Sequence, residues 1–451
     1  MQIMLNEKLA HVAVIGAAGK LGSGIALLLL QEMARSAAEI KGRIQGEIQL
    51  VVIDTNEKSL IERCVYWKKQ LTRYAEKNVI ALRHYFREDD ALIENAEITN
   101  AFVEGAMSSL KISSDLNMAK EAKLIFEAVL EDMDLKTKIF TQLKKICSAD
   151  ALFFSNTSSI PISILNSRSG LYEHIFGFHF YNPPAVQELL EFVPPAHAAE
   201  SFINLAMELA RRLNKTVVTA KDVAGFVGNG HFFREVVFAL EELKAFQNKS
   251  ALKDFETLYC LDRMTRDFLI RPMGLFQLLD YIGINIGQAI LKIMETNLPL
   301  EKFHYSLIIE MVHRNVCGGQ QADGSQKDGF FQYEKNNISG VYSLAQKSYV
   351  PLSAGDWVRR CEEKMGPLPA GHIPWKKLIK QENKEGVLKT YFKDLFSQQT
   401  LAARQAQQYL VHSRKVADEL VKKGIARTQQ DINLVLQKGF AHAYGPFNDY
   451  Y

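Results

Sequence analysis

The residues best suited to chemistry in this chain are a histidine and a glutamate, His179 and Glu191, twelve positions apart. His179 follows the apolar run at residues 175–178, and Glu191 lies inside another apolar run, residues 189–193. An unpaired carboxylate among apolar side chains is unfavourable. A hydrogen bond to His179 would remove that penalty and produce a general base. We therefore predict a buried pair formed by these two side chains.

A second polar group follows a neighbouring apolar run. Residues 152–154 are apolar and lead into the sequence SNTSS at residues 155–159. Ligands of parallel α/β sheets bind beyond the carboxyl ends of the strands, so we expect SNTSS and His179 at one edge. Alone, His179 would as readily be a core histidine with satisfied hydrogen bonds. Together with SNTSS and Glu191 it favours a catalytic site.

A glycine-rich turn near the start of the chain predicts a dinucleotide site. The apolar run at residues 11–15 is followed at once by Gly16, Gly19 and Gly22, and then by an apolar helix at residues 23–33. Strand, glycine turn and helix in this order allow a pyrophosphate to approach the backbone at the helix N-terminus. The simpler alternative is a structural turn between a strand and a helix.

An acid at the end of the next predicted strand suggests which dinucleotide is bound. Asp54 follows residues 48–53, and a carboxylate there binds the ribose of NAD and repels the 2′-phosphate of NADP. The distance from the glycines exceeds the usual ~20 residues. A longer first helix and a loop at residues 41–43 would account for the additional residues between the glycines and Asp54.

Charged residues continue along this α/β region. The stretch from residue 57 to residue 87 is helical in pattern and rich in lysine and arginine, and most of these side chains are expected on a solvated face. Arg73 and Lys77, one turn apart, are candidates for a phosphate-bearing substrate. After a strand at residues 123–126, Glu131 and Lys136 are expected at the same edge as His179.

Helices predominate after residue 222. Asn229 lies near the start of the first long helix, where it suits either a substrate contact or a helix cap. Residues 261–281 resemble residues 432–451, and an ungapped alignment places Gly274 on Gly445. Such repetition predicts a duplicated helical unit. We therefore expect an α/β Rossmann-type domain followed by an all-α region of two related units, with domains at residues 1–222, 223–340 and 341–451, the last truncated.

The composition excludes several classes of protein. A net charge of +3 over 451 residues, with no basic block, gives no nucleic-acid footprint. The five cysteines are scattered, which argues against a zinc site or any other metal site and favours a reducing cytoplasm. We expect neither a signal peptide nor a membrane span, because the longest apolar run is residues 25–30.

Six motifs occur in a fixed order: FEAVLED at 126–132, SNTSS at 155–159, GFHFYNPP at 177–184, GFVGN at 225–229, RPMGLFQLLDYIG at 271–283 and GFFQY at 329–333. With Glu191, they resemble the L-3-hydroxyacyl-CoA dehydrogenases of fatty-acid β-oxidation. The resemblance is greatest to the dehydrogenase part of the multifunctional enzymes, whose helical domain is duplicated. It covers the chain to about Tyr333 and, more weakly, residues 432–451.

The resemblance implies roles for individual residues. His179 would be the catalytic base, held by Glu191, with Ser158 and Asn229 at the reacting oxygen of the substrate. NAD would be bound through the glycine loop, with Asp54 at the adenosine ribose. The residues implied on the nicotinamide side are Glu131, Lys136 and Asn156, and the one implied at the CoA moiety is Lys77.

The chain departs from the family pattern in three ways. The usual phosphate loop is G-x-G-x-x-G, whereas residues 16–22 read G-x-x-G-x-x-G, as in malate dehydrogenases. Ser325 stands where a basic residue is expected, with Lys327 nearby. We expect no hydratase domain before Met1, so coupling to hydration would need a separate enoyl-CoA hydratase, and a thiolase is a further possible partner.

The function expected is reversible NAD-dependent oxidation of an L-3-hydroxyacyl-CoA to the 3-ketoacyl-CoA, with the pair formed by His179 and Glu191 as base and acid. One alternative is a dehydrogenase of a free hydroxy acid on the same scaffold. Another is a non-catalytic scaffold subunit, which the altered glycine loop and the truncated repeat would favour. The chain would be a monomer or a homodimer, because the second helical unit could replace a dimer contact.

Overall fold

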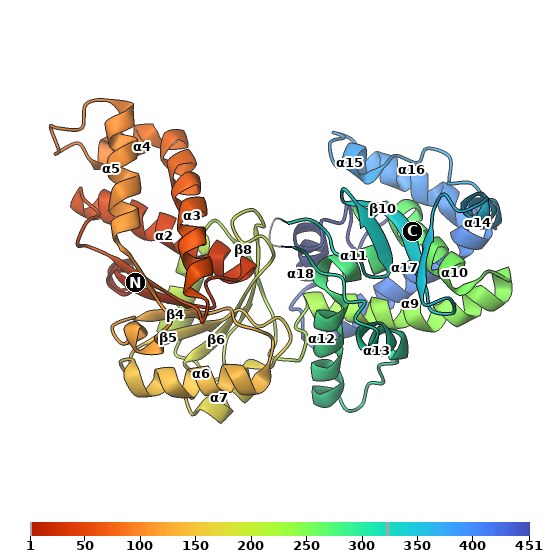
Figure 1. Ribbon diagram of the computed structural model, residues 1–451, viewed down its shortest axis with the longest axis horizontal. Helices are drawn as coiled ribbons and strands as arrows, with labels where there is room; N and C mark the ends of the chain where they lie inside the picture. Colours follow the sequence, from red (N-terminus) through yellow and green to blue (C-terminus); the bar gives the residue numbers. More distant parts are fainter. Residues whose placement is uncertain (1, 322–323) are drawn as a thin grey trace. The chain divides into compact units, whose positions relative to one another are not determined.

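The computed structural model describes residues 2–321 and 324–451, which form two compact units divided between Asp222 and Val223 (Figure 1). The first unit has the α/β class predicted for it. The second is predominantly helical, and its helices include two related segments. No helix among the described residues is long and apolar enough to cross a membrane.

An eight-stranded sheet forms the first unit, in the order β3-β2-β1-β4-β5-β6-β7-β8. The order 3-2-1-4-5-6 is that of Rossmann folds, whose ligands bind where the strand order reverses, here between β1 and β4. The strands are β1 (His11–Ile15), β2 (Gln49–Ile53), β3 (Leu110–Ser113), β4 (Leu124–Glu127), β5 (Leu152–Ser155), β6 (Ile175–Phe180), β7 (Leu189–Val193) and β8 (Thr216–Thr219).

The last two strands run in the opposite direction to the other six. The pairing of β6 with β7 is antiparallel, and that of β7 with β8 is parallel. The sheet is therefore mostly parallel, with one antiparallel pairing between β6 and β7. The connection between β6 and β7 spans residues 181–188 without a helix. A parallel return needs a crossover of a dozen or more residues, so this short loop requires a reversal.

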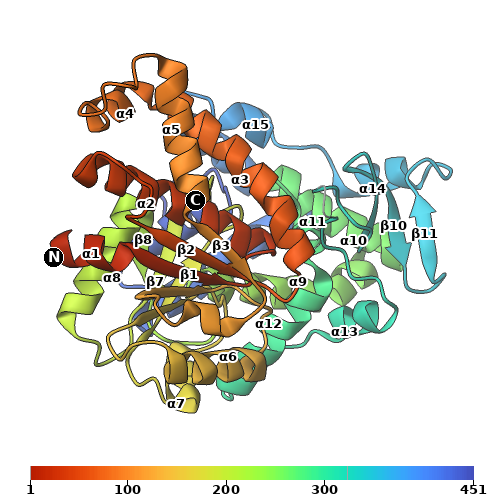
Figure 2. The ribbon, with the colours of Figure 1, turned by 60° about the vertical axis from the view of Figure 1, so that its left-hand side comes forward.

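Helices cover both faces of this sheet. They are α1 (Gln2–Leu9), α2 (Lys20–Lys41), α3 (Glu57–Lys77), α4 (Val79–Tyr85), α5 (Asn95–Ser108), η1 (Leu116–Ala119), α6 (Met133–Ile146), α7 (Ile162–Ser169) and α8 (Glu200–Arg212). The helix α2 ends at Gly42 in a left-handed conformation, so the longer first helix expected before Asp54 is present. Figure 2 shows α3 beside α5, which leads into β3.

A layer of aromatic rings fixes the position of β6 in the sheet. The ring of Phe178 lies 5.0 Å from that of Phe154 and 6.1 Å from that of Phe126, measured between centroids. Successive side chains of a strand point to opposite faces. His179 therefore points away from this aromatic layer, and packing of the layer determines where the histidine lies.

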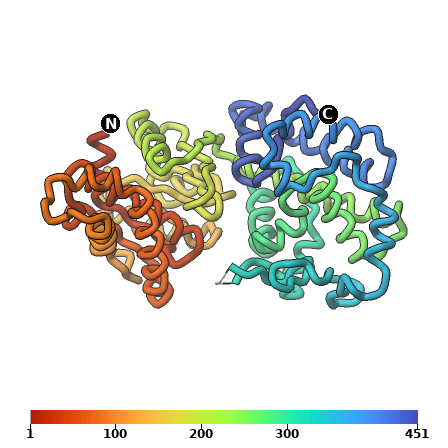
Figure 3. Tube along the Cα trace, turned by 90° about the horizontal axis from the view of Figure 1, so that it is seen from above, coloured from red at the N-terminus to blue at the C-terminus, as the bar shows by residue number. Residues whose placement is uncertain are grey.

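The second unit is built around two long helices that pack against each other, α9 (Gly228–Ser250) and α17 (Leu401–Lys422), and Figure 3 follows the chain between them. The other helical segments are α10 (Asp254–Arg263), η2 (Met264–Phe268), α11 (Leu275–Ile282), α12 (Ile284–Asn297), α13 (Ser306–His313), α14 (Trp357–Met365), α15 (Trp375–Leu378), α16 (Lys384–Ser397), α18 (Gln429–Leu434) and η3 (Val435–Gly439).

Two segments of this unit repeat one another, as the predicted helical duplication requires. A five-residue π-helix follows α10 as η2 and follows α18 as η3. The amide N–H of Phe276 donates to Asp262 Oδ1, and that of Phe447 donates to Asn433 Oδ1. The residue pairs related by the repeat are Asp262 and Asn433, Ile270 and Ala441 (both with positive φ), and Gly274 and Gly445.

A small antiparallel sheet adds to the expected all-helical region. It consists of β9 (Phe331–Glu334), β10 (Asn337–Ser343) and β11 (Ser348–Pro351). Lys335 and Asn336 both have positive φ and form the two-residue turn between β9 and β10. Helix periodicity gave no sign of these short strands. The boundary predicted at residue 340 falls inside β10, and the division of the region there stays a prediction.

Candidate active site

The glycine turn brings the start of α2 against the ends of β1 and β4. Gly16 has a φ of +82°, and a Cβ there would lie 2.7 Å from the carbonyl oxygen of Ala128. A Cβ at Gly22 would lie 2.0 Å from the carbonyl oxygen of Gly16. Gly19 is the N-cap of α2. Only glycine allows this close approach, which leaves the helix N-terminus open to a pyrophosphate.

The extra residue of the turn is held by two side chains. Asp54, at the end of β2, accepts a hydrogen bond from the Ala18 amide through Oδ2 at 3.0 Å. Arg63 Nε, on α3, donates to the Ala18 carbonyl oxygen at 3.2 Å. Both peptide groups of the added residue are thus satisfied, which explains how the longer loop keeps a defined shape. The role of Asp54 at a ribose stays a prediction.

His179 and Glu191 lie directly opposite each other on β6 and β7, as paired residues of the antiparallel register. The distance from His179 Nδ1 to Glu191 Oε2 is 2.9 Å. Glu191 is fully buried and His179 is 8% exposed. Because a carboxylate accepts, Nδ1 carries the proton and Nε2 is the acceptor nitrogen of the neutral ring. The arrangement suits a general base.

Tyr181 is a third member of this group, and sequence reasoning did not find it. Its hydroxyl donates to Glu191 Oε2 at 2.9 Å, and its ring centroid lies 4.8 Å from that of His179. Alternation along the strand puts residues two apart on one side, so a phenol two positions after His179 was the available signal. Burial and the charge of Glu191 raise the pKa of Tyr181 well above its usual value.

Asn156 links the strand that carries SNTSS to the strand that carries His179. Its side-chain oxygen accepts a hydrogen bond from the Phe180 amide at 2.8 Å. The backbone N–H of Asn156 donates to the Glu127 carbonyl oxygen at 2.8 Å. Asn156 therefore continues the contact between β5 and β6 and fixes the backbone next to His179. Its role at a nicotinamide stays a prediction.

Glu131 organises the turn after β5. Its Oε1 accepts hydrogen bonds from the hydroxyls of Thr157 and Ser159, at 2.7 and 2.8 Å, and from the amide of Ser158 at 2.9 Å. Thr157 and Ser159 are buried, whereas Ser158 is partly exposed. Burial raises the pKa of Glu131, but the charge of Lys136 and these hydrogen bonds outweigh it, and the pKa lies below its usual value.

Lys136 is enclosed between two carboxylates and is 1% exposed at its side chain. Its Nζ lies 2.5 Å from Glu127 Oε1 and 3.5 Å from Glu131 Oε2. Burial lowers the pKa of Lys136, but the two carboxylates outweigh burial, and the pKa is raised. Sequence reasoning missed Glu127, which also accepts from the Ser155 hydroxyl at 2.7 Å. The two residues lie opposite each other in the register of β4 and β5, a pairing that only the structure shows.

Lys215 holds the loop that leads away from His179. Its Nζ donates to the carbonyl oxygens of Pro184 and Gln187 at 2.6 and 2.7 Å. Burial lowers the pKa of Lys215 to about 8. Pro184 in turn packs against α2, since a Cβ at Gly24 would lie 2.7 Å from its ring. The loop of residues 181–188 is thereby tied to the helix that follows the glycine turn.

Three other residues predicted for the site are on helices that carry none of the side chains described above. Arg73 and Lys77 are exposed in the last two turns of α3. Asn229 is the second residue of α9 and belongs to the second unit. The roles of these three residues stay predictions.

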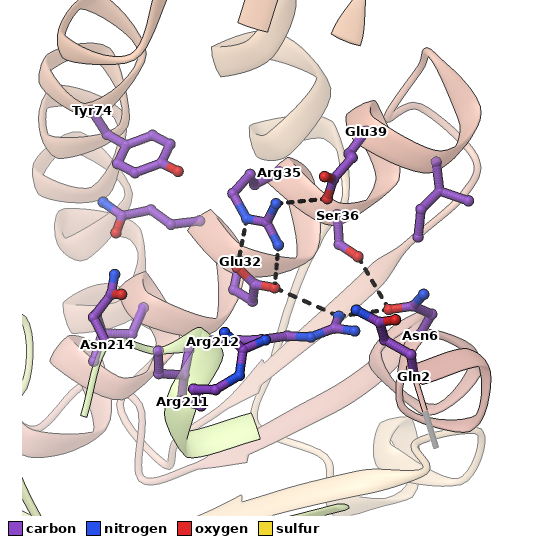
Figure 4. A pocket seen from close by; sticks show the side chains of 14 residues that line it. Gln2, Asn6, Glu32, Arg35, Ser36, Glu39, Tyr74, Arg211, Arg212 and Asn214 are labelled. Atoms are coloured by element: carbon purple, nitrogen blue, oxygen red, sulfur yellow. Dashed lines mark hydrogen bonds and ion pairs between the residues drawn. The ribbon is translucent and has the colours of Figure 1, made fainter. Parts of the chain in front are cut away.

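A charged pocket of about 630 Å³ also opens in the first unit, between α1, α2 and α8 (Figure 4). Arg35 lies between Glu32 and Glu39, at 2.8 and 2.7 Å. Arg212 donates to Asn6 Oδ1 at 2.6 Å and lies 3.7 Å from Glu32. These charges are paired with one another and join three helices, so the pocket has a structural explanation and contains none of the predicted site residues.

Two family models match the chain. Residues 11–223 match the model described as 3-hydroxyacyl-CoA dehydrogenase, NAD binding domain. Residues 249–331 match the model described as 3-hydroxyacyl-CoA dehydrogenase, C-terminal domain. The first match contains the glycine turn and His179, and the second contains the first copy of the helical repeat.

Curated relatives and solved structures agree with these models. A probable 3-hydroxybutyryl-CoA dehydrogenase of Bacillus subtilis is 26% identical over 71% of this chain and 97% of its own length. The glyoxysomal fatty acid beta-oxidation multifunctional protein MFP-a of Cucumis sativus is 27% identical over 62% of this chain. The matched region covers only 37% of the length of MFP-a. The 3-hydroxybutyryl-CoA dehydrogenase of Escherichia coli shares the fold, with a TM-score of 0.60 over 97% of this chain and 90% of that chain at 19% identity.

Proposed function

The chain belongs to the 3-hydroxyacyl-CoA dehydrogenase family, and from that premise we propose that it interconverts an L-3-hydroxyacyl-CoA and the 3-ketoacyl-CoA, with NAD as its cofactor. The proposed base and acid of the reaction is His179, paired with Glu191. One observation carries the proposal. A buried carboxylate is hydrogen-bonded to a histidine on the strand that follows β5 in a NAD-binding sheet.

The geometry of the pair suits proton transfer at a hydroxyl group. An alcohol releases hydride readily only as its O–H proton departs, so a base must lie at that oxygen. Nδ1 of His179 donates to Glu191 at 2.9 Å, so Nε2 is the ring nitrogen that accepts the proton. The carboxylate stabilises the positive ring that results. In the reverse direction the charged ring donates to the ketone oxygen. NAD, when bound, supplies the hydride acceptor.

Other residues complete the proposed site. The glycine turn fits a pyrophosphate at the N-terminus of α2. A Cβ at Gly16 or Gly22 would collide with the backbone and disrupt this turn. The roles proposed for single residues are pyrophosphate binding by Gly16, Gly19 and Gly22, ribose binding by Asp54, support of the nicotinamide side by Glu131, Lys136 and Asn156, and contact with the substrate oxygen by Ser158 and Asn229.

The substrate class is the part of the proposal that rests most on relatives. Exposed Arg73 and Lys77 are proposed to meet the phosphates of CoA. A separate enoyl-CoA hydratase or thiolase would supply or consume the acyl-CoA in β-oxidation. Five free cysteines fit a reducing compartment, and we propose a cytoplasmic location and a monomeric or homodimeric state.

The proposal is tested by following NADH oxidation at 340 nm with acetoacetyl-CoA and, in parallel, with free acetoacetate. We expect oxidation that requires the CoA ester. Oxidation of NADH by free acetoacetate at an equal rate would instead establish the hydroxy-acid alternative. A protein that does not bind NADH in a fluorescence titration would contradict the proposed dehydrogenase and favour the scaffold alternative.

A further inference from the structure

One oxygen of Glu191 accepts two hydrogen bonds, one from His179 on β6 and one from Tyr181, the residue that follows β6. His179 Nδ1 lies 2.9 Å from Glu191 Oε2, and the Tyr181 hydroxyl lies 2.9 Å from the same atom. The two rings lie side by side, with centroids 4.8 Å apart. Glu191 is fully buried, so these contacts are made away from water. The phenol and the imidazole therefore share one carboxylate charge.

We propose that Tyr181 is a positioning residue for the proposed base: its hydroxyl holds Glu191 ionised and oriented, and thereby limits how strongly His179 binds a proton. The catalytic meaning of this inference rests on the proposed function. The effect on the protonation of His179 rests on the geometry alone.

The negative charge of Glu191 is distributed over both of its hydrogen-bond donors. A hydrogen bond to a carboxylate favours its charged form, and bonds to charged groups are stronger than neutral ones. The Tyr181 hydroxyl stabilises part of the negative charge that would otherwise act only on the imidazolium. Burial, together with the charge of Glu191, raises the pKa of Tyr181 well above its usual value, so the phenol stays a neutral donor at working pH.

The neighbouring strands and the loop after β8 present different groups on the two sides of Glu191. On one side β6 and the residue after it present His179 and Tyr181. On the other side β8 places the neutral Val218 opposite Glu191. Asp222, after β8, accepts hydrogen bonds from the amides of Ile162 and Ser163 at the start of α7, at 2.6 and 2.7 Å. Tyr181 is a neutral donor in direct contact with this carboxylate, and its hydroxyl can be removed without changing the charge of any group.

The test is the titration of His179 in the full-length wild-type protein and in Tyr181→Phe, followed by NMR of isotope-labelled histidine. The chain has 11 histidines, and His179→Gln identifies the signal by its disappearance. Without the phenol, the carboxylate should hold the imidazolium more strongly. We expect the midpoint of the His179 titration to rise by about half a pH unit to one unit. An unchanged or lower midpoint overturns the inference, even if Tyr181→Phe unfolds at a lower temperature.

Activity supplies a second readout with a matched control. Tyr172→Phe removes the hydroxyl of a tyrosine that is 71% exposed, and it should leave both the midpoint and turnover unchanged. With acetoacetyl-CoA, kcat of Tyr181→Phe should fall by about 3- to 10-fold while the KM for NADH stays constant. An equal kcat for the two variants overturns the positioning role. If the wild-type protein does not turn over acetoacetyl-CoA, the proposed function fails, and the NMR midpoint still decides the inference.

Discussion

Two carboxylates of the first unit, the partly buried Glu131 and the fully buried Glu191, have very different partners. Glu131 Oε1 receives hydroxyl and amide donors from residues 157–159, and Lys136 lies beside its second oxygen. Glu191 Oε2 receives an imidazole and a phenol. None of the donors to Glu131 changes protonation near neutral pH, so this carboxylate determines the shape of a loop.

The partner of Glu191 can change its charge. An imidazole can gain a proton while the carboxylate beside it stays in place. Burial of a carboxylate therefore does not by itself indicate a catalytic group. The chemistry of the groups that donate hydrogen bonds to it does. Replacing residues in the loop-shaping group should change stability and cofactor binding, and replacing residues around Glu191 should change turnover.

The largest effect is expected at Lys136. Lys136→Met would leave the buried Glu127 and the partly buried Glu131 without their counter-charge. Breaking a buried ion pair typically lowers stability by about 3–5 kcal/mol. The free energy of unfolding is measured by urea denaturation followed by circular dichroism. Lys138→Met, at an exposed position of the same helix, should change it by less than about 0.5 kcal/mol. Equal stability of the two variants would contradict the structural role of Lys136.

Glu191→Gln should affect turnover rather than folding. The neutral amide can still contact His179 and Tyr181 but no longer stabilises a positive ring. We expect kcat with acetoacetyl-CoA to fall by ~10²-fold or more, with the affinity for NADH retained. Glu200→Gln, at an exposed position in the first turn of α8, serves as the control. A kcat within a few-fold of wild type would remove Glu191 from the mechanism.

Arg63→Ala should act on cofactor binding and leave proton transfer unchanged. The Ala18 carbonyl oxygen would lose the donor that lies at 3.2 Å, and the glycine turn would be less well ordered. We expect the KM for NADH to rise by about 3- to 10-fold with little change in kcat. Lys58→Ala, exposed near the start of the same helix, should change neither. A fall in kcat at an unchanged KM would be the opposite of this expectation.

The smallest effect is a dependence of stability on pH. The pKa of Glu131 is lowered in the folded state, so its stabilising contribution is complete above its usual value of 4.5 and is lost as the pH falls through the folded value. The difference in free energy of unfolding between wild type and Glu131→Gln should therefore shrink below pH 4.5, by about 1 kcal/mol or less. Urea denaturation at pH 6 and pH 4 measures it. A difference that grows at pH 4 would contradict the depressed pKa.

Sequence patterns predicted the elements of this protein better than the contacts between them. Apolar strand patterns and the glycine-rich turn predicted the Rossmann-type domain. The sequence similarity that aligns Gly274 with Gly445 predicted the duplicated helices. The proximity of His179 and Glu191 was also foreseeable, because an acid in one apolar strand needs a partner in another. Such inferences depend only on local pattern and on the cost of burying charge.

Other features depend on packing between distant segments. The reversal of β7 and β8 follows from the short loop of residues 181–188. Asn182, Pro183 and Pro184 in this loop signal a turn but do not specify the direction of the next strand. The hydrogen bonds of Ala18 to Asp54 and to Arg63 join residues that are 36 and 45 positions apart in the sequence, respectively. The enclosure of Lys136 by Glu127 was hidden because charged residues usually signal surface. Tertiary contact decides each of these, and no local pattern encodes it.

The most direct test of the account is the rate of NADH oxidation with acetoacetyl-CoA by the wild-type protein and by His179→Gln, measured side by side at 340 nm. We expect CoA-dependent turnover by the wild type and a loss of ~10²-fold or more in the variant, with NADH still bound by both. Near-normal turnover in His179→Gln would contradict the central claim that this histidine, held by Glu191, transfers the proton.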